Sequence, residues 1–189
     1  PAKQSWDVSQ NGDGSLTANL YLNADGTYAL HFEGSGAMKS FGSESSVSWR
    51  SYRSNITSVR LPEGLTTVGN YAFYQFTGLT EITLPEGLQS IGSYAFSDCS
   101  ALETITLPDE IIIGAGAFAN TAYYNDFANW SNSVLYIGKH LICAKTDLSG
   151  KYKIKAGTKT IATNAFSGCG NLTDVTIPEG VTIIGDGAF

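Results

Sequence analysis

The chain has 189 residues, of which 42% are apolar and 15% charged, and its net charge is -6 with a pI near 4.8. This composition is typical of a folded protein with a substantial core. The acidic balance argues against nucleic acid or an anionic membrane as the general partner, because both need a basic surface, and no run of 18 apolar residues is present to insert into a membrane.

Residues 1–54 are predicted to form a β-rich cap and a lead-in to the rest of the chain. The runs "SLTANLYL" and "TYALHFEG" both alternate apolar and polar residues, and the turn-forming stretch from Asn23 to Gly26 lies between them. This pattern predicts a hairpin. The Gly- and Ser-rich stretch that follows indicates a loop, in which Met38, Phe41 and Trp49 are the candidate buried residues.

The rest of the sequence, residues 55–189, contains an internal repeat marked by Ala-Phe pairs. The pairs end at Phe73, Phe96, Phe118, Phe166 and Phe189, which are separated by 23, 22, 48 and 23 residues. A period of about 23 residues predicts one solenoid coil per repeat, in which each unit buries its apolar side only against its neighbours. The last repeat stops at its Ala-Phe pair, so we expect the last coil to expose apolar side chains.

One repeat combines two apolar periods. In "TEITLP", Ile82 and Leu84 alternate with Glu81 and Thr83, which predicts a short strand with one buried face. Pro85 ends that strand. The apolar residues that follow are spaced by four, one, three and three positions, which predicts a short helical segment with one buried side; they are Ile91, Ala95, Phe96, Cys99 and Leu102.

The long step of 48 residues marks an irregular insert, residues 119–150. The stretch "VLYIGKHLICAK" has two apolar runs around Gly138 and Lys139, which predicts a small hairpin. Upstream, "TAYYNDFANW" concentrates four aromatic residues. They suggest either a ligand platform, for example for sugar rings, or rings that cover the side of the inserted coil; they are Tyr123, Tyr124, Phe127 and Trp130.

The repeat "LPEGLQSIGSYAFSDCSALETITLP" resembles the BspA-like leucine-rich repeats of bacteria, whose units carry the form LxxIxLPxxLxxIGxxAFxxCxxL. The resemblance runs from about Ile56 to the C-terminus, with Phe76 and Thr121 in place of the usual Cys. It implies an α/β leucine-rich repeat solenoid, the alpha-beta horseshoe, to which the patterns above add an N-terminal β-hairpin cap and an inserted hairpin. It also implies an extracellular or cell-surface bacterial protein without enzymatic activity, and in some members adhesion to host or matrix proteins. Residues 1–20 lack a signal-peptide layout, so any signal segment is expected to precede Pro1.

The sequence shows no pattern that favours catalysis or a cofactor. His31 and His140 lie far apart, and GxSxG, HExxH and phosphate-binding glycine motifs are missing. The three cysteines form no CxxC or Cys/His pairing suited to a metal. We therefore expect a protein that is not an enzyme and that uses no cofactor and no metal.

The charge distribution indicates where a partner would bind. Six of the 11 Lys and Arg residues lie between Lys139 and Lys159, with Asp147 as the only acid there. This basic segment can steer an acidic partner, or its lysines only solubilise the sheet and pair across strands, as Lys151 with Asp174. The candidate contacts are Glu81, Thr83, Thr104 and Thr106 on the outward strand face, Lys139, His140, Lys151, Lys153 and Lys155 in the basic segment, and Tyr123, Tyr124 and Trp130 in the aromatic stretch.

Three functions are compatible with these patterns. The leading hypothesis is a non-enzymatic surface or secreted module that binds a protein, such as host extracellular matrix, or an acidic or sulfated polymer. The second is a glycan-binding surface protein that uses the aromatic stretch. The third is an architectural spacer within a larger surface protein.

Overall fold

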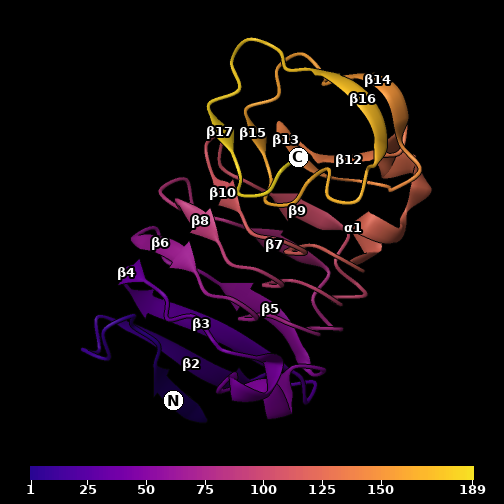
Figure 1. Ribbon diagram of the computed structural model, residues 1–189. Helices are drawn as coiled ribbons and strands as arrows, with labels where there is room; N and C mark the ends of the chain where they lie inside the picture. Colours follow the sequence, from indigo (N-terminus) through magenta and orange to yellow (C-terminus); the bar gives the residue numbers. More distant parts are fainter.

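The computed structural model describes residues 1–189 as a β-solenoid that rises from an N-terminal sheet to the C-terminal coils (Figure 1). Five coils are named here in chain order: coil 1 (56–79), coil 2 (80–102), coil 3 (103–121), coil 4 (149–170) and coil 5 (171–189). The expected solenoid is confirmed, and each coil contributes one strand to each of two rows.

The first row carries the strands that the sequence predicted: β5 (Ile56–Arg60), β7 (Glu81–Thr83), β9 (Thr104–Thr106), β14 (Ser149–Lys153) and β16 (Asn171–Thr176). The second row begins with β4 (Gly36–Ala37) of the lead-in and continues with the strand after the turn of each coil: β6 (Leu65–Val68), β8 (Ser90–Ile91), β10 (Ile112–Ile113), β15 (Thr160–Ile161) and β17 (Ile183–Ile184). Pairing between successive coils is parallel, as in β7 with β9 and β14 with β16.

The N-terminal residues cap the stack with an antiparallel sheet of β1 (Gln4–Asp7), β2 (Leu16–Leu22) and β3 (Tyr28–Gly34), and β3 pairs in parallel with β5. The predicted hairpin is therefore confirmed. Two 3-10 turns follow, Glu44–Ser46 and Arg50–Tyr52. Trp49 between them is fully buried, and its Nε1 donates to the carbonyl of Ala72 at 2.8 Å. The lead-in thus packs against coil 1, as expected.

A column of stacked Phe rings runs through the coils. The ring centroids of Phe73 and Phe96 are 5.0 Å apart, and those of Phe96 and Phe118 are 5.5 Å apart. Phe166 and Phe189 form a second stack at 5.2 Å. These rings are the largest apolar groups that adjacent coils share, so they supply much of the contact between neighbours.

The helical segment predicted in each repeat is wrong, because two successive turns stand in its place. In coil 2, Tyr94 and Asp98 have φ angles of 57° and 59°, a left-handed conformation that interrupts an α-helix. Gln75 of coil 1 corresponds to Asp98 of coil 2 and has a φ of 58°. The structure contains a single α-helix, the four residues of α1 (Ala122–Asn125).

The turns form because their N–H groups bond to the next coil. The N–H groups of Tyr94, Phe96 and Asp98 donate to the carbonyls of Ala115, Ala117 and Ala119 of coil 3 at 3.0, 2.8 and 2.9 Å. In an α-helix the same N–H groups would bond within their own segment. We call this third row of bonds between coils the turn ladder. Two turns in succession also bring apolar residues to one side every three or four positions, which is why the pattern resembled that of a helix.

The insert forms the predicted hairpin, but the hairpin runs inside the solenoid. It consists of β12 (Val134–Ile137) and β13 (His140–Ala144), preceded by a 3-10 turn (Phe127–Asn129) and β11 (Trp130–Ser131). All four residues of β12 are buried. Leu135 and Ile137 pack into the core of the cap and coils 1 to 3, whereas Val134 and Tyr136 pack into the core of coils 4 and 5. Strand β12 therefore separates two cores.

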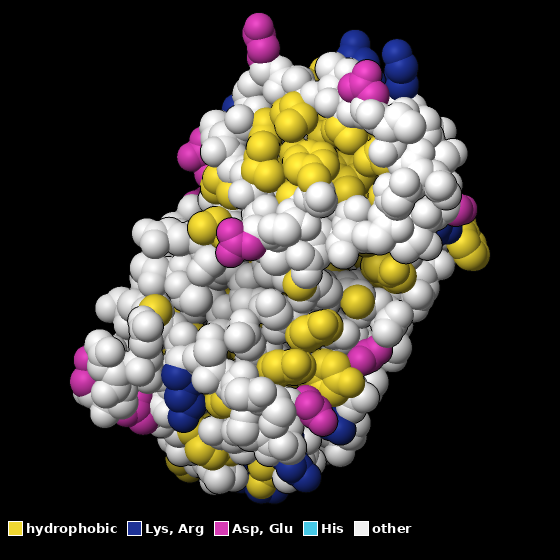
Figure 2. All heavy atoms as spheres, viewed as in Figure 1, with side chains coloured by type: hydrophobic (Ala, Val, Ile, Leu, Met, Phe, Trp, Pro, Cys, Tyr) yellow, Lys and Arg dark blue, Asp and Glu magenta, His cyan; other side chains and the backbone are white.

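The last coil exposes apolar side chains, as expected. Phe189 is 60% exposed and Ile184 is 50% exposed. Figure 2 shows this apolar area on the face around the C-terminus.

We expect Phe96→Ala to lower the free energy of unfolding by roughly 3–5 kcal/mol, as a buried large-to-small change does. Phe96 is fully buried between two stacked rings. Chemical denaturation of the variant and of a control, Glu81→Ala on the exposed strand face, measures the difference. Equal midpoints for the two variants would show that the assignment of faces is incorrect.

A glycine substitution distinguishes turns from helix. Gln75→Gly should leave stability unchanged or raise it by up to about 1 kcal/mol, because glycine adopts a positive φ without steric cost. Ser100→Gly, at an exposed position without a positive φ, should lose about 0.5–1 kcal/mol through backbone entropy. Thermal melts in which both variants lose the same amount would indicate a helical segment instead.

Candidate functional site

The outward face of the first strand row lies where the sequence placed it. Glu81 and Thr83 of β7 are exposed on either side of the buried Ile82. Glu81 lies opposite Thr104 of β9, and Thr83 lies opposite Thr106, both exposed as well. The four candidate residues therefore form one continuous patch, whose side chains take no part in the core.

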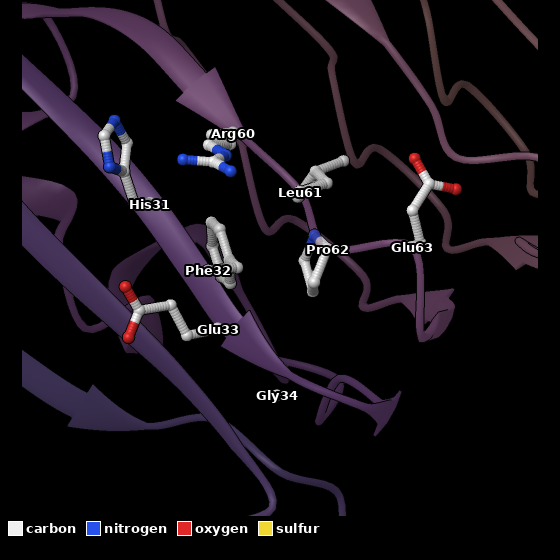
Figure 3. Close-up of a pocket in the computed structure, with 8 residues that line it drawn as sticks. All are labelled: His31, Phe32, Glu33, Gly34, Arg60, Leu61, Pro62 and Glu63. Atoms are coloured by element: carbon white, nitrogen blue, oxygen red, sulfur yellow. The ribbon is translucent and has the colours of Figure 1, made fainter.

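A groove follows the ends of these strands, and we call it the strand-end groove. Its largest hollow, of about 390 Å³, lies between the end of β3 and the loop after β5 (Figure 3). A second hollow of about 300 Å³ shares the loop after β5 and reaches β7. A third, of about 230 Å³, lies between the end of β9 and the turn of the inserted hairpin. The first two hollows share Arg60, Leu61 and Glu63, whereas the third shares no lining residue with them. The strand-end groove therefore consists of two separate stretches between the cap and the insert.

Charged groups of both signs line the first hollow. His31 of β3 and Arg60 of β5 are register neighbours. Figure 3 shows Arg60 between His31 and Leu61, with the carboxylates of Glu33 and Glu63 on opposite sides. His31 points outward, as expected, and its ring lies 4.9 Å from that of Tyr21. None of these charged side chains forms a salt bridge, so they remain available to a partner.

The lysines of the basic segment divide into two groups. Lys139 donates to both carboxylate oxygens of Asp109 at 2.8 Å, and this bond lowers the pKa of Asp109. Lys155 lies with its Nζ 4.4 Å from the centroid of the Tyr136 ring. These two lysines already have partners within the chain, although the pair with Asp109 is exposed and adds little to stability.

Lys151 and Lys153 are exposed on β14, on either side of the buried Tyr152. Lys151 is in register with Asp174 of β16, as the cross-strand alternative requires, but no salt bridge joins the two. Figure 2 shows basic side chains that project above the last coils beside an acidic one. These two lysines are the ammonium groups of the strand face that the chain itself leaves without a partner.

His140 is inside the protein, which removes it from the set of candidate contacts. Its side chain is 2% exposed, and its Nδ1 lies 2.7 Å from the Oγ1 of Thr160. Burial lowers the pKa of His140. The turn ends at Lys139, and His140 already begins β13, which pairs with β15 of coil 4. The sequence placed His140 beside an exposed turn because that pairing is not visible in the order of residues.

Three of the aromatic residues of the insert cover its side, as the second interpretation expected. Tyr123, Tyr124 and Trp130 are half-buried against the core of coils 1 to 3. The hydroxyl of Tyr123 donates to the carbonyl of Tyr136 at 2.8 Å, and Nε1 of Trp130 donates to the carbonyl of Tyr124 at 2.7 Å. These bonds hold the rings in structural positions.

Phe127 differs from the other rings, because it is 79% exposed. The Nζ of Lys145 lies 4.9 Å from its centroid and 4.7 Å from that of Trp130. Lys145 was not among the residues that the sequence singled out. An ammonium between two rings is a cation–π arrangement. The sequence does not reveal this one, because Lys145 follows β13 and only the fold of the hairpin brings it next to Phe127 and Trp130.

No group of three or more His, Cys, Asp or Glu side chains is positioned to hold a metal ion. The three cysteines are free, and burial raises the pKa of the Cys99 and Cys143 thiols to about 12, which makes them poor nucleophiles. None of the helices has the length and apolar character needed to cross a membrane.

Comparisons with known proteins agree with this architecture. The family model described as "BspA type Leucine rich repeat region" matches in six copies, over residues 50–150 and 143–189. A solved leucine-rich repeat protein from Eubacterium ventriosum is similar with a TM-score of 0.51 and 23% identity, over 98% of this chain and 63% of that one. A leucine rich cell surface protein from Faecalibacterium prausnitzii has a TM-score of 0.41 and 24% identity, over 100% of this chain and 46% of that one.

The chain therefore spans less than two thirds of the length of these two proteins. Comparison with curated proteins gave no match. At this level of identity the likeness concerns the fold alone.

The burial of His140 predicts how stability depends on pH. Because its pKa is lowered in the folded state, the unfolded chain takes up a proton near pH 6.5 while the folded chain does not. The contribution to stability is full above pH 6.5 and is lost as the pH falls toward the folded pKa.

Denaturation at pH 7.5 and pH 5 should therefore show a larger loss for the native sequence than for His140→Gln. His31→Gln is the control, because it removes the other histidine, which lies at the surface. An equal loss in the native protein and in His140→Gln would contradict the assignment.

Proposed function

Because the chain belongs to the BspA-type leucine-rich repeat family, we propose that it is a non-enzymatic module of the bacterial cell surface that binds a protein along its outward strand face. The observation that carries this proposal is the continuity of that face. Exposed polar side chains of β7 and β9 lie beside the two stretches of the strand-end groove, one next to the cap and one next to the insert. An extended surface of this kind is how solenoids present binding sites.

The exposed charges differ between the two ends of this face. Charged residues of both signs, Arg60, Glu63 and Glu81, line the groove at coils 1 and 2, whereas the charged residues exposed on β14 of coil 4 are both basic, Lys151 and Lys153. A partner with an acidic region would therefore bind with that region over β14. Host matrix proteins and sulfated polymers offer such regions, which makes adhesion the finer form of the proposal. Exposed charges of this kind influence the rate and specificity of association more than the final affinity.

A glycan ligand is the second candidate, and Phe127 is the observation that favours it. Its exposed ring lies beside Lys145 and close to Trp130, and flat aromatic faces suit the apolar faces of sugar rings. Binding to a glycan array that is lost in Phe127→Ala would support this alternative. Binding that survives this change would leave the strand face as the site.

The proposal is tested by changing Lys151, Lys153 and Lys155 together to Ser. We expect weaker binding to a panel of immobilised extracellular matrix proteins and to heparin, together with a flatter salt dependence, since exposed charges are screened over about 8 Å at physiological ionic strength. Affinities are measured at two salt concentrations. Stability should change little, because these side chains are outside the core.

The matched control changes three basic residues of the cap region, Lys3, Lys39 and Arg53, to Ser. It removes the same charge from the far end of the stack and should leave binding to the panel nearly unchanged. Equal weakening by both triple variants would indicate a nonspecific charge effect and would contradict a site on the strand face.

A further inference from the structure

The turn ladder is interrupted between coils 3 and 4. In coil 2, three N–H groups of the turns donate to the next coil. The corresponding groups of coil 3 belong to Gly116, Phe118 and Asn120, and no carbonyl or side chain accepts from any of them. The φ angles of Gly116 and Asn120, 63° and 58°, match those of their counterparts in coil 2, so the three N–H groups point along the stack toward coil 4.

One of these donors is buried. Phe118 is 0% exposed, so its N–H group lies away from bulk solvent without an acceptor. Buried backbone donors are nearly always paired in folded proteins, because leaving one unpaired costs the lost hydration. An unpaired buried N–H in an otherwise regular ladder therefore points to an acceptor from another molecule.

Strand β13 pairs with β12 on one side and with β15 of coil 4 on the other, and none of its carbonyls accepts from the turns of coil 3. The N–H of Ala144 donates to the carbonyl of Ala165 at 2.7 Å, the bond that Phe73 and Phe96 make in coils 1 and 2. Ala144 thus occupies a Phe position of the repeat with a small side chain. The Phe column is broken at this point, between Phe118 and Phe166.

A cavity of about 140 Å³ lies at this break. Its walls include Gly116 and Phe118 of coil 3, Tyr124, and Ile142 and Cys143 of β13. An apolar cavity of about 150 Å³ admits a benzene-sized molecule. The cavity therefore suits one aromatic side chain, placed against Phe118 as the next ring of the column would be.

We propose that the break in the turn ladder binds an extended segment of a protein partner, which lies between the turns of coil 3 and strand β13. Carbonyls at positions i, i+2 and i+4 of the segment accept from Gly116, Phe118 and Asn120, as Ser93, Ala95 and Ser97 accept from coil 1. An aromatic side chain at position i+3, the place of Phe96, enters the cavity.

A polypeptide fits this site better than a small molecule. The three donors lie on alternate residues and point in one direction, and a polypeptide backbone offers acceptors at that spacing. The segments that accept in the intact ladder carry small residues at the accepting positions: Ser93, Ala95 and Ser97 in coil 2, and Ala115, Ala117 and Ala119 in coil 3. The expected segment therefore has small residues around one aromatic. This site uses the turns, not the strand face, so it is a second surface beyond the function proposed above.

Amide hydrogen exchange of the whole chain tests the proposal, with a probe peptide that copies residues 92–98, Gly-Ser-Tyr-Ala-Phe-Ser-Asp, with blocked ends. In the free protein, the amides of Gly116, Phe118 and Asn120 should exchange faster than those of Tyr94, Phe96 and Asp98. Saturation with the peptide should slow the three coil 3 amides by at least about tenfold. Equal protection of both sets in the free protein would remove the premise.

Four controls test what occupies the site and whether it is separate from the strand face. A peptide with Phe replaced by Ala and a scrambled peptide should give no protection. Benzoate alone should give none either, and protection by benzoate equal to that by the peptide would mean a small-molecule pocket and overturn the proposal. The protein variant with Lys151, Lys153 and Lys155 changed to Ser should still bind the peptide, so failure of the strand face and failure of this site are separable.

A protein variant provides the last arm. Cys143→Phe places a ring into the cavity from β13 and should abolish protection by the peptide. Its melting temperature and the unchanged exchange of Tyr94, Phe96 and Asp98 show whether it folds. If the variant does not fold, the peptide series on the native protein still decides, and undiminished protection in a folded variant would contradict the site.

Discussion

Backbone hydrogen bonding between coils is the constraint from which the rest of this structure follows. A coil of about 23 residues is too short to satisfy its own N–H and carbonyl groups, so it uses those of its neighbours in two strand rows and in the turn ladder. Close approach of the backbones is the consequence. A Cβ at Gly92 would lie 2.4 Å from the N atom of Asn70, and one at Gly114 would lie 2.5 Å from that of Ser93. Glycine recurs at this position in coils 1, 2, 3 and 5 for this reason, and coil 4 has Ala162 there.

The same constraint explains why the insert becomes a partition. Coil 3 ends with apolar side chains that face along the stack, and β12 packs against them with Leu135 and Ile137, while Val134 and Tyr136 pack into the core of the coils beyond. A strand can serve two cores because its side chains alternate between its faces. The hydroxyls of Tyr136 and Tyr152, 2.9 Å apart, satisfy each other on the second side. The solenoid continues after the insert, but the turns of coil 3 form no hydrogen bonds of the turn ladder with the next coil.

The sequence predicted the parts of the fold that depend on local pattern. The period located the coils, strand alternation placed Glu81 and Lys151 outward, and the flanking runs located both hairpins. The sequence-based prediction was wrong where contacts with distant residues of the chain decide the conformation. The turns of each repeat were taken for helix because bonding between coils is invisible in one repeat, and His140 was placed at the surface because its neighbour Thr160 lies 20 residues away. The pair of His31 and Arg60 depends on the register of β3 and β5 in the same way.

These limits follow from the fact that different positions of a solenoid repeat serve folding and binding. Apolar and glycine positions are set by contacts between coils and carry little information about a partner, whereas the outward positions of each strand are free of that requirement. On the first row these free positions carry Arg60 in coil 1, Glu81 in coil 2, Lys151 and Lys153 in coil 4 and Asp174 in coil 5, although the scaffold beneath them is repetitive. A partner that contacts this order of charges must lie along the stack in one orientation. The insert is the one place along the stack that differs from the repeating coils. It therefore defines the position at which a partner binds along the face, in addition to the partner's orientation.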